Sequence, residues 1–169
     1  GFLLKREKKR IGIIGNNIFS LKRMNSIKKA YEMSDAILVP SKHVYRTIKK
    51  RAKVNQKFIM NPYGCPFPII KKVDSNYETI NLICVARLHY RKGIRYLLKV
   101  FELINKNFPD KYKLNVIGSE TSAKGFDNSL KIENVNFLGN RNKEEIKNLF
   151  RNSHIFILPS LEEGQALVI

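Results

Sequence analysis

The stretch that most constrains the fold is INLICVARLHYRKGIRYLLKVF, residues 80–101. It opens with a continuous apolar run, typical of a buried strand, and ends with apolar residues at helical spacing. Between the two lies a short turn that carries Arg87, Arg91, Lys92 and Gly93. The free N–H groups and the dipole of a helix N-terminus favour negative charge, so this arrangement predicts a site for an anion such as a diphosphate. An ordinary polar turn remains the alternative, because neither a GxGxxG motif nor a P-loop motif is present.

The rest of the second half continues the alternation of strands and helices. We predict further strands at 114–117, 135–138 and 154–158, a helix from about Gly93 to Asn107, and another after a cap at Asn142. Alternating elements of this length predict a parallel sheet covered by helices. Ligands of such sheets bind beyond the carboxyl ends of the strands. The residues that follow strand ends, and so should share one edge, are Arg87, Lys92, Gly118, Gly139 and the segment 159–164.

The first half contains shorter elements and ends in a proline-rich stretch whose composition is typical of a linker between domains. RIGII at 10–14 predicts a short strand, and apolar residues from Leu21 to Tyr31 predict a helix of about three turns. Strands are predicted at 36–40 and 58–60, with a helix after an N-cap at Ser41. We therefore expect residues 1–64 in one domain, a linker at 65–79 and a second domain at 80–169. Because the chain starts with Gly1 and stops in an apolar run, we expect it to be a piece of a longer protein.

The net charge of +18 is uneven along the chain, with +13 in residues 1–60 and +5 in residues 61–169. This excess suits an anionic partner, either a lipid headgroup surface or a nucleic acid. Solvated surface lysines are the alternative. Nucleic acid is disfavoured because the basic residues are not interleaved with an aromatic platform. No apolar run approaches the roughly 20 residues of a membrane span, and the two cysteines form no metal-binding pattern and fit a reducing cytoplasm.

A second candidate site is PSLEEGQAL at 159–167. The carboxylates of Glu162 and Glu163 can accept hydrogen bonds from sugar hydroxyls, and Gly164 allows a ligand to approach the backbone. An acidic loop at the start of a helix is the alternative. Among the histidines, His154 is expected to be structural and His89 is a candidate ligand contact; no Ser-His-Asp arrangement is present.

Four segments resemble the large retaining glycosyltransferase family 4, which has the GT-B fold. VARLHYRKGIRYLLKVF (85–101) resembles its R-x4-K-G segment, and the stretch from 137 to 169 resembles its FLG…PSxxEGxxLv segment. LNVIGSE (114–120) resembles the strand that carries a family glycine, and residues 34–64 resemble the passage between the two domains. The four segments occur in the family's order and spacing, and the resemblance covers the chain from about residue 25 onward.

The resemblance implies the end of an N-terminal Rossmann-like domain followed by most of a C-terminal donor-binding one. It implies that Arg87 and Lys92 hold the donor diphosphate and that Glu163 faces the transferred sugar. The other implied substrate-binding residues are Gly93, Gly118, Gly139, Gly164, Gln165, Ala166 and Leu167. Gln165 occupies a position that is often aromatic in the family, so the sugar preference does not carry over. The second family glutamate would fall two residues beyond Ile169.

We therefore expect an enzyme that transfers a sugar, with retention, from a nucleotide-diphosphate sugar to a glycan or glycolipid hydroxyl. It should need no metal or other cofactor, act in the cytoplasm, and contact an anionic surface at the inner face of the membrane. This chain alone should be inactive. The alternatives are a non-catalytic basic module that binds nucleic acid or membrane, and a degenerate homologue.

Overall fold

A computed structural model of the chain describes residues 2–10, 12, 21–52, 54–64, 77–119 and 131–166. By its internal contacts the chain divides into two compact units. The larger unit comprises Gly1–Ile13 and Ile69–Glu162, and the smaller comprises Ile14–Pro68 and Glu163–Leu167. Each unit has its own core and is described by itself.

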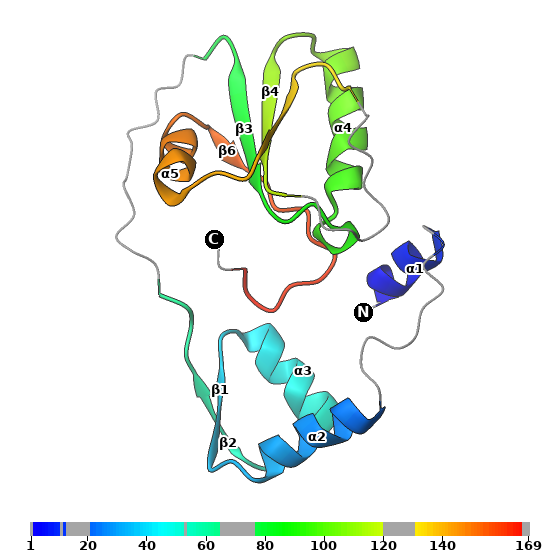
Figure 1. Cartoon of the computed structure of the whole chain (residues 1–169), viewed down its shortest axis with the longest axis vertical. Helices are drawn as coiled ribbons and strands as arrows, with labels where there is room; N and C mark the ends of the chain where they lie inside the picture. Colours follow the sequence, from blue (N-terminus) through cyan, green and yellow to red (C-terminus); the bar gives the residue numbers. More distant parts are fainter. Residues whose placement is uncertain are drawn as a thin grey trace. The chain divides into compact units, whose positions relative to one another are not determined.

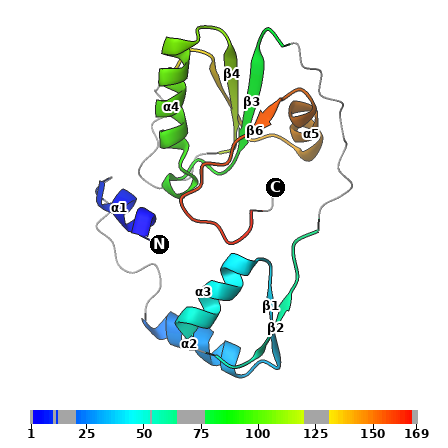
Figure 2. The same ribbon diagram turned by 180° about the vertical axis from the view of Figure 1, so that it is seen from behind.

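The larger unit is built on a four-stranded sheet in the order β5-β4-β3-β6. All its neighbouring strands run parallel, as the alternation of elements predicted. Helices α4 and α5 flank the strands on opposite sides (Figures 1 and 2). The last strand, β6, is shorter than the predicted 154–158. The elements are β3 (Ile80–Val85), α4 (Ile94–Asn107), β4 (Tyr112–Ile117), β5 (Val135–Gly139), α5 (Lys143–Arg151) and β6 (Ile155–Phe156).

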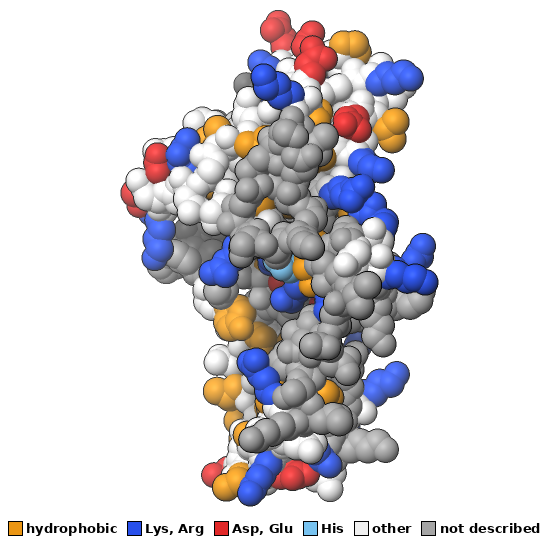
Figure 3. Space-filling view, turned by 45° about the vertical axis from the view of Figure 1, so that its right-hand side comes forward, with side chains coloured by type: hydrophobic (Ala, Val, Ile, Leu, Met, Phe, Trp, Pro, Cys, Tyr) orange, Lys and Arg blue, Asp and Glu red, His pale blue; other side chains and the backbone are white. Residues whose placement is uncertain are grey.

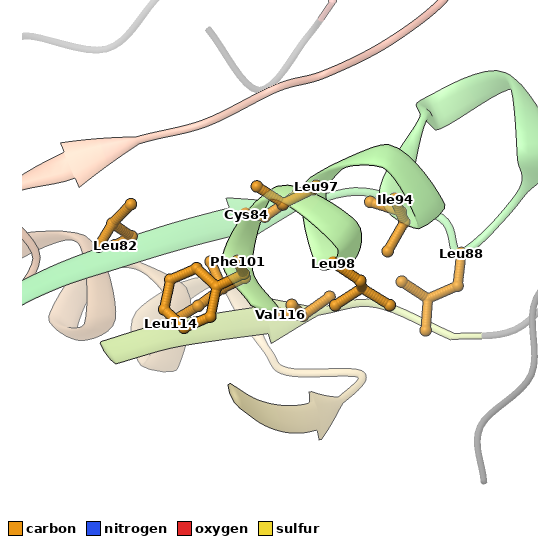
Figure 4. Packing of buried hydrophobic residues seen from close by; sticks show 9 residues of the cluster. All are labelled: Leu82, Cys84, Leu88, Ile94, Leu97, Leu98, Phe101, Leu114 and Val116. Atoms are coloured by element: carbon orange, nitrogen blue, oxygen red, sulfur yellow. The ribbon is translucent and has the colours of Figure 1, made fainter. Parts of the chain in front are cut away.

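The core of the larger unit lies between α4 and the sheet (Figure 4). The helix buries Ile94, Leu97, Leu98 and Phe101, which are spaced three or four residues apart and therefore share one face. Phe101 is fully buried. Opposite this face, strands β3 and β4 contribute alternate residues, namely Leu82, Cys84, Leu114 and Val116. This packing holds the first turn of α4 at the carboxyl end of β3.

Helix α5 begins where its cap was predicted. The Asn142 side chain accepts a hydrogen bond from the Glu145 N–H (2.9 Å), and the Glu145 side chain accepts one from the Asn142 N–H (2.8 Å). This reciprocal capping box satisfies two N–H groups that the helix itself leaves unpaired.

The smaller unit contains α2 (Leu21–Glu32), β1 (Ala36–Val39), α3 (Lys42–Ala52) and β2 (Lys57–Met60). Its two strands are parallel and pair Leu38 with Ile59. Ile37 and Val39 point into a core with Val54, whereas Leu38 on the opposite face is 61% exposed. Ser41 caps α3, as predicted, by accepting a hydrogen bond from the Val44 N–H (3.2 Å).

The N-terminal segment differs from its prediction. Residues Phe2–Arg10 form helix α1, and Gly12 lies in a turn with a φ of 68°. The prediction of a strand at 10–14 is therefore wrong at Arg10 and at Gly12, while positions 11, 13 and 14 lie outside the described residues. Within this basic segment, the acidic Glu7 accepts a hydrogen bond from the Tyr96 hydroxyl of α4, which attaches α1 to the rest of the larger unit.

The contact-based units also differ from the predicted boundaries 1–64, 65–79 and 80–169 at two places. Gly1–Ile13 belongs with the larger unit, and Glu163–Leu167 belongs with the smaller one. Most of the predicted linker, residues 65–76, lies outside the described ranges.

On the face drawn in Figure 3, the Lys and Arg side chains of the described residues are scattered among neutral ones. None of the described helices combines the length and the apolar character needed to cross a bilayer.

Candidate functional site

The candidate site in the larger unit lies at the carboxyl edge of the sheet. Backbone hydrogen bonds tie the segments after three strands together there: Leu88 N–H donates to the Ser119 carbonyl (2.9 Å), and Gly118 N–H donates to the Gly139 carbonyl (2.9 Å). Arg87 and Lys92 follow β3 on the same edge. The structure therefore brings Arg87, Lys92, Gly93, Gly118 and Gly139 to one edge, as the sequence predicted.

The turn between β3 and α4 contains a short 3-10 helix, η1 (Tyr90–Lys92). Gly93 ends it in the left-handed conformation, with φ 68°, and at the same time starts α4. The Lys92 N–H donates to the His89 carbonyl (2.8 Å), and the Gly93 N–H donates to the Tyr90 carbonyl (3.2 Å). These two N–H groups are thus used inside the turn. The next two, of Ile94 and Arg95, have no backbone partner among the described residues and are the donors that α4 can offer an anion.

Two glycines at this edge are needed because the backbone passes close by. A Cβ at Gly93 would collide with the Pro159 carbonyl oxygen, and one at Gly118, where φ is 140°, would collide with the Ala86 carbonyl oxygen. The Leu161 N–H also donates to the Arg91 carbonyl (2.8 Å). The segment after β6 is therefore fastened against the turn after β3.

The side chains at the turn divide by exposure. Arg87 is exposed and Lys92 is partly buried, which leaves the Arg87 guanidinium accessible to a ligand. The hydroxyl of Ser160, between Pro159 and Leu161, is buried and has no hydrogen-bond partner among the described residues. This edge therefore carries two cations, the N–H groups of the first turn of α4 and a buried hydroxyl. Groups of these kinds can bind phosphate oxygens.

His89 belongs to the framework of the turn. Its Nδ1 accepts a hydrogen bond from the Arg91 N–H (3.2 Å), and its ring stacks on Tyr90 with 4.1 Å between the ring centres. Burial lowers the pKa of His89, and the positive charges of Arg91 and Lys92 lower it further. The neutral imidazole that accepts the Arg91 N–H is therefore the favoured form at neutral pH.

Helix α1 contributes a buried carboxylate next to the first turn of α4. Glu7 is 2% exposed. It accepts two hydrogen bonds from the Arg10 guanidinium (3.0 and 2.6 Å) and one from the Tyr96 hydroxyl (2.5 Å). The hydrogen bond from Arg10 is the main cause of the lowered pKa of Glu7, which therefore remains ionised at neutral pH. A pocket of about 950 Å³ is lined by these residues and by Arg6, Lys9, Pro159 and Leu161.

The rest of the second candidate segment belongs to the smaller unit. The Ser41 hydroxyl, besides capping α3, donates to the Gly164 carbonyl (2.7 Å). A Cβ at Gly164 would lie 3.0 Å from a methyl group of Val44. Ala166 is buried, and the side-chain oxygen of Gln165 is buried without a hydrogen-bond partner among the described residues. Gly164 is thus held at the N-terminal end of α3.

The predicted site residues are therefore divided between the units. Arg87, Lys92, Gly93, Gly118 and Gly139 lie in the larger one, and Glu163, Gly164, Gln165 and Ala166 in the smaller one. Leu167 lies outside the described residues. The roles assigned to these residues remain predictions.

Sequence reasoning did not find the cluster of Glu7, Arg10 and Tyr96, or the capping role of His89. The histidine could have been found, since it directly precedes a turn that needs an acceptor. The contact between Glu7 and Tyr96 joins residues 89 positions apart and leaves no local signal.

Comparisons with known proteins agree with this architecture. The model of the family described as glycosyl transferases group 1 matches residues 68–169. An uncharacterized glycosyltransferase from Haemophilus influenzae is 35% identical over 96 residues, which are 54% of this chain and 26% of the relative. A Campylobacter jejuni protein is 29% identical over 147 residues, 83% of this chain and 38% of the relative. That protein is named as an alpha-1,4-N-acetyl-D-galactosaminyltransferase acting on a PP-undecaprenol-linked saccharide.

Solved structures share the fold at low sequence identity. The pneumococcal O-GlcNAc transferase GtfA, crystallised with UDP and GlcNAc, matches with a TM-score of 0.67 and 16% identity, covering 87% of this chain and 30% of GtfA. Sucrose-phosphate synthase from Thermosynechococcus elongatus matches with a TM-score of 0.68 and 17% identity, covering 89% of this chain and 41% of the synthase.

The chain spans less than half the length of each of these relatives. The family model covers more than half of the chain itself, and the structural neighbours are GT-B proteins. The chain therefore belongs to the glycosyl transferases group 1 family and has part of a GT-B fold.

Proposed function

We propose that this chain is the donor-binding part of a retaining glycosyltransferase that uses a nucleotide-diphosphate sugar. The observation that carries the proposal is the edge of the larger unit, where Arg87, Lys92 and the first turn of α4 follow one strand. Family membership supports it, because glycosyl transfer is the chemistry for which the family is named.

In this proposal the cations act where negative charge develops. When the bond between the sugar and the diphosphate breaks, the leaving diphosphate gains charge. The Arg87 guanidinium, the Lys92 ammonium and the N–H groups of Ile94 and Arg95 would stabilise that charge. Because these groups supply the positive charge, we propose that the transfer requires no metal. Glu163 would face the transferred sugar, and the backbone at Gly164 would approach it closely.

For the acceptor we propose a hydroxyl of a lipid-linked or envelope glycan. The name of the Campylobacter relative includes a polyprenyl diphosphate, which supports an acceptor of this kind. The excess of basic residues in the first 60 positions supports a peripheral location at the inner, cytoplasmic face of an anionic membrane. The activity would belong to the full-length protein, and this chain alone would be inactive.

The donor role is tested by Arg87→Ala and Lys92→Ala in the full-length enzyme, once thermal shift with UDP-, GDP- and ADP-sugars has identified the donor. Each variant should lower kcat/KM by about 100-fold or more, since each removes a group that stabilises developing charge. Lys99→Ala is the matched control, because Lys99 is an exposed cation further along α4. Values within twofold of wild type for both site variants would exclude the assignment.

Vesicle sedimentation tests the membrane proposal separately. Binding to anionic vesicles should be strong at low salt and lost at high salt, while zwitterionic vesicles should not bind. Equal binding to both kinds of vesicle would rule out an electrostatic contact. A steep salt dependence of binding to DNA or RNA would instead favour a nucleic-acid partner.

A further inference from the structure

The turn that carries Lys92 is held by a side chain outside the R-x4-K-G pattern. His89 makes three hydrogen bonds there: its N–H donates to the Arg87 carbonyl (2.8 Å), its carbonyl accepts the Lys92 N–H (2.8 Å), and its Nδ1 accepts the Arg91 N–H (3.2 Å). The first two bonds use the backbone, so most residues could make them. The third needs an acceptor on the side chain, and it closes η1 at its N-terminal end.

The position of this contact links it to both cations of the candidate site. The bonds of His89 begin at the Arg87 carbonyl and end at the Lys92 N–H. Gly93 then starts α4 against the Pro159 carbonyl, so the turn is held at its C-terminal end as well as at its N-terminal end. An unpaired Arg91 N–H would allow the three-residue turn to open, which would move Lys92 and the first N–H groups of α4 together.

We propose that His89 is a positioning residue for the donor diphosphate, its ring nitrogen capping the turn that presents Arg87 and Lys92. The proposal rests on the donor role assigned above and adds to it a residue that need not touch the ligand. Its neutral ring carries the remaining proton on Nε2, because Nδ1 serves as the acceptor. Burial disfavours the imidazolium, which could not accept the bond, and the nearby positive charges of Arg91 and Lys92 lower the pKa of His89 further.

The chain offers a matched control in His154. Its Nδ1 also accepts a backbone N–H, that of Asn81 (2.8 Å), and its ring also stacks on a tyrosine, Tyr77, at 3.8 Å. His154 precedes β6 and Asn81 lies near the start of β3, so this contact belongs to the amino edge of the sheet. Removing it breaks the same type of bond far from the turn.

The experiment compares His89→Leu, His89→Asn and His154→Leu in the full-length protein. Isothermal titration uses UDP, GDP or ADP, whichever binds the wild type most tightly. His89→Leu should weaken this binding about fivefold, the factor expected for a lost N-cap. His89→Asn should restore it to within about twofold, because asparagine is a preferred N-cap. His154→Leu should lower Tm without weakening the binding.

Hydrogen exchange of the Arg91 amide gives a readout that needs no ligand. Exchange should be about fivefold faster in His89→Leu than in wild type and near normal in His89→Asn. An unchanged exchange rate in His89→Leu would overturn the capping contact. If Arg87→Ala weakens nucleotide binding and His89→Leu does not, only the positioning role is overturned. If Arg87→Ala has no effect on binding, the donor role itself is overturned.

Discussion

Replacing Gly93 by alanine should destabilise the larger unit much more than the same change at Gly139. The two glycines have nearly equal φ angles, 68° and 66°. An added Cβ at Gly139 meets nothing within 4 Å, whereas one at Gly93 runs into the Pro159 carbonyl oxygen. The pair therefore separates the strain of the left-handed conformation from the effect of a steric collision.

The magnitudes follow from these two terms. Placing an L-residue in the left-handed region costs about 1–2 kcal/mol of folding stability, and this cost applies to both variants. Forcing an extra carbon into a filled space adds about 1–3 kcal/mol, and this applies only to Gly93→Ala. We expect Gly139→Ala to lower the free energy of unfolding by about 1–2 kcal/mol and Gly93→Ala by about 2–5 kcal/mol.

Urea unfolding followed by far-UV circular dichroism measures the difference, since the chain contains no tryptophan. Nucleotide binding should also weaken in Gly93→Ala, because the Pro159 segment must move away from the turn. The reasoning fails if both variants unfold at the same urea concentration with equal m-values. Such a result would mean that the 159–161 segment does not lie against Gly93 in solution.

Three further predictions concern buried groups. Hydrogen bonding to Arg10 lowers the pKa of Glu7, so its ionised form should stabilise the fold by about 1–3 kcal/mol relative to Glu7→Gln at pH 7. This advantage should shrink as the pH falls below 4.5, the ordinary pKa, because the unfolded chain then takes up a proton at Glu7 before the folded chain does. Urea titrations of both proteins at pH 7 and pH 4 measure the advantage, and equal values at the two pH values would contradict the prediction. Burial raises the pKa of Cys84 to about 12, so peptide mapping should find it unalkylated by iodoacetamide at pH 8 until urea is added; labelling of the native protein would contradict this. Phe101→Ala should lower the free energy of unfolding by about 3–5 kcal/mol, against less than about 0.5 kcal/mol for the exposed Val100→Thr, and similar values for both would contradict the assigned core.

The parts that sequence reasoning predicted well depend on neighbours in the chain. The buried face of α4 follows from residues three and four apart, and the start of α5 follows from Asn142 and Glu145. The parallel sheet follows from the order of its elements, and that order puts Arg87, Gly118 and Gly139 on one edge. The helical segment Phe2–Arg10 was missed because it lacks a regular apolar stripe among its many charges.

The local pattern of this sequence determined the strands, the helix faces, the caps and the edge on which a ligand site can form. Only the tertiary structure decided which distant groups meet. In the larger unit the Pro159 carbonyl lies against Gly93 and the Tyr96 hydroxyl donates to Glu7. In the smaller unit the Ser41 hydroxyl donates to the Gly164 carbonyl. The physical reason is that periodicity and capping act over a few residues, whereas these contacts depend on where separate segments of backbone meet.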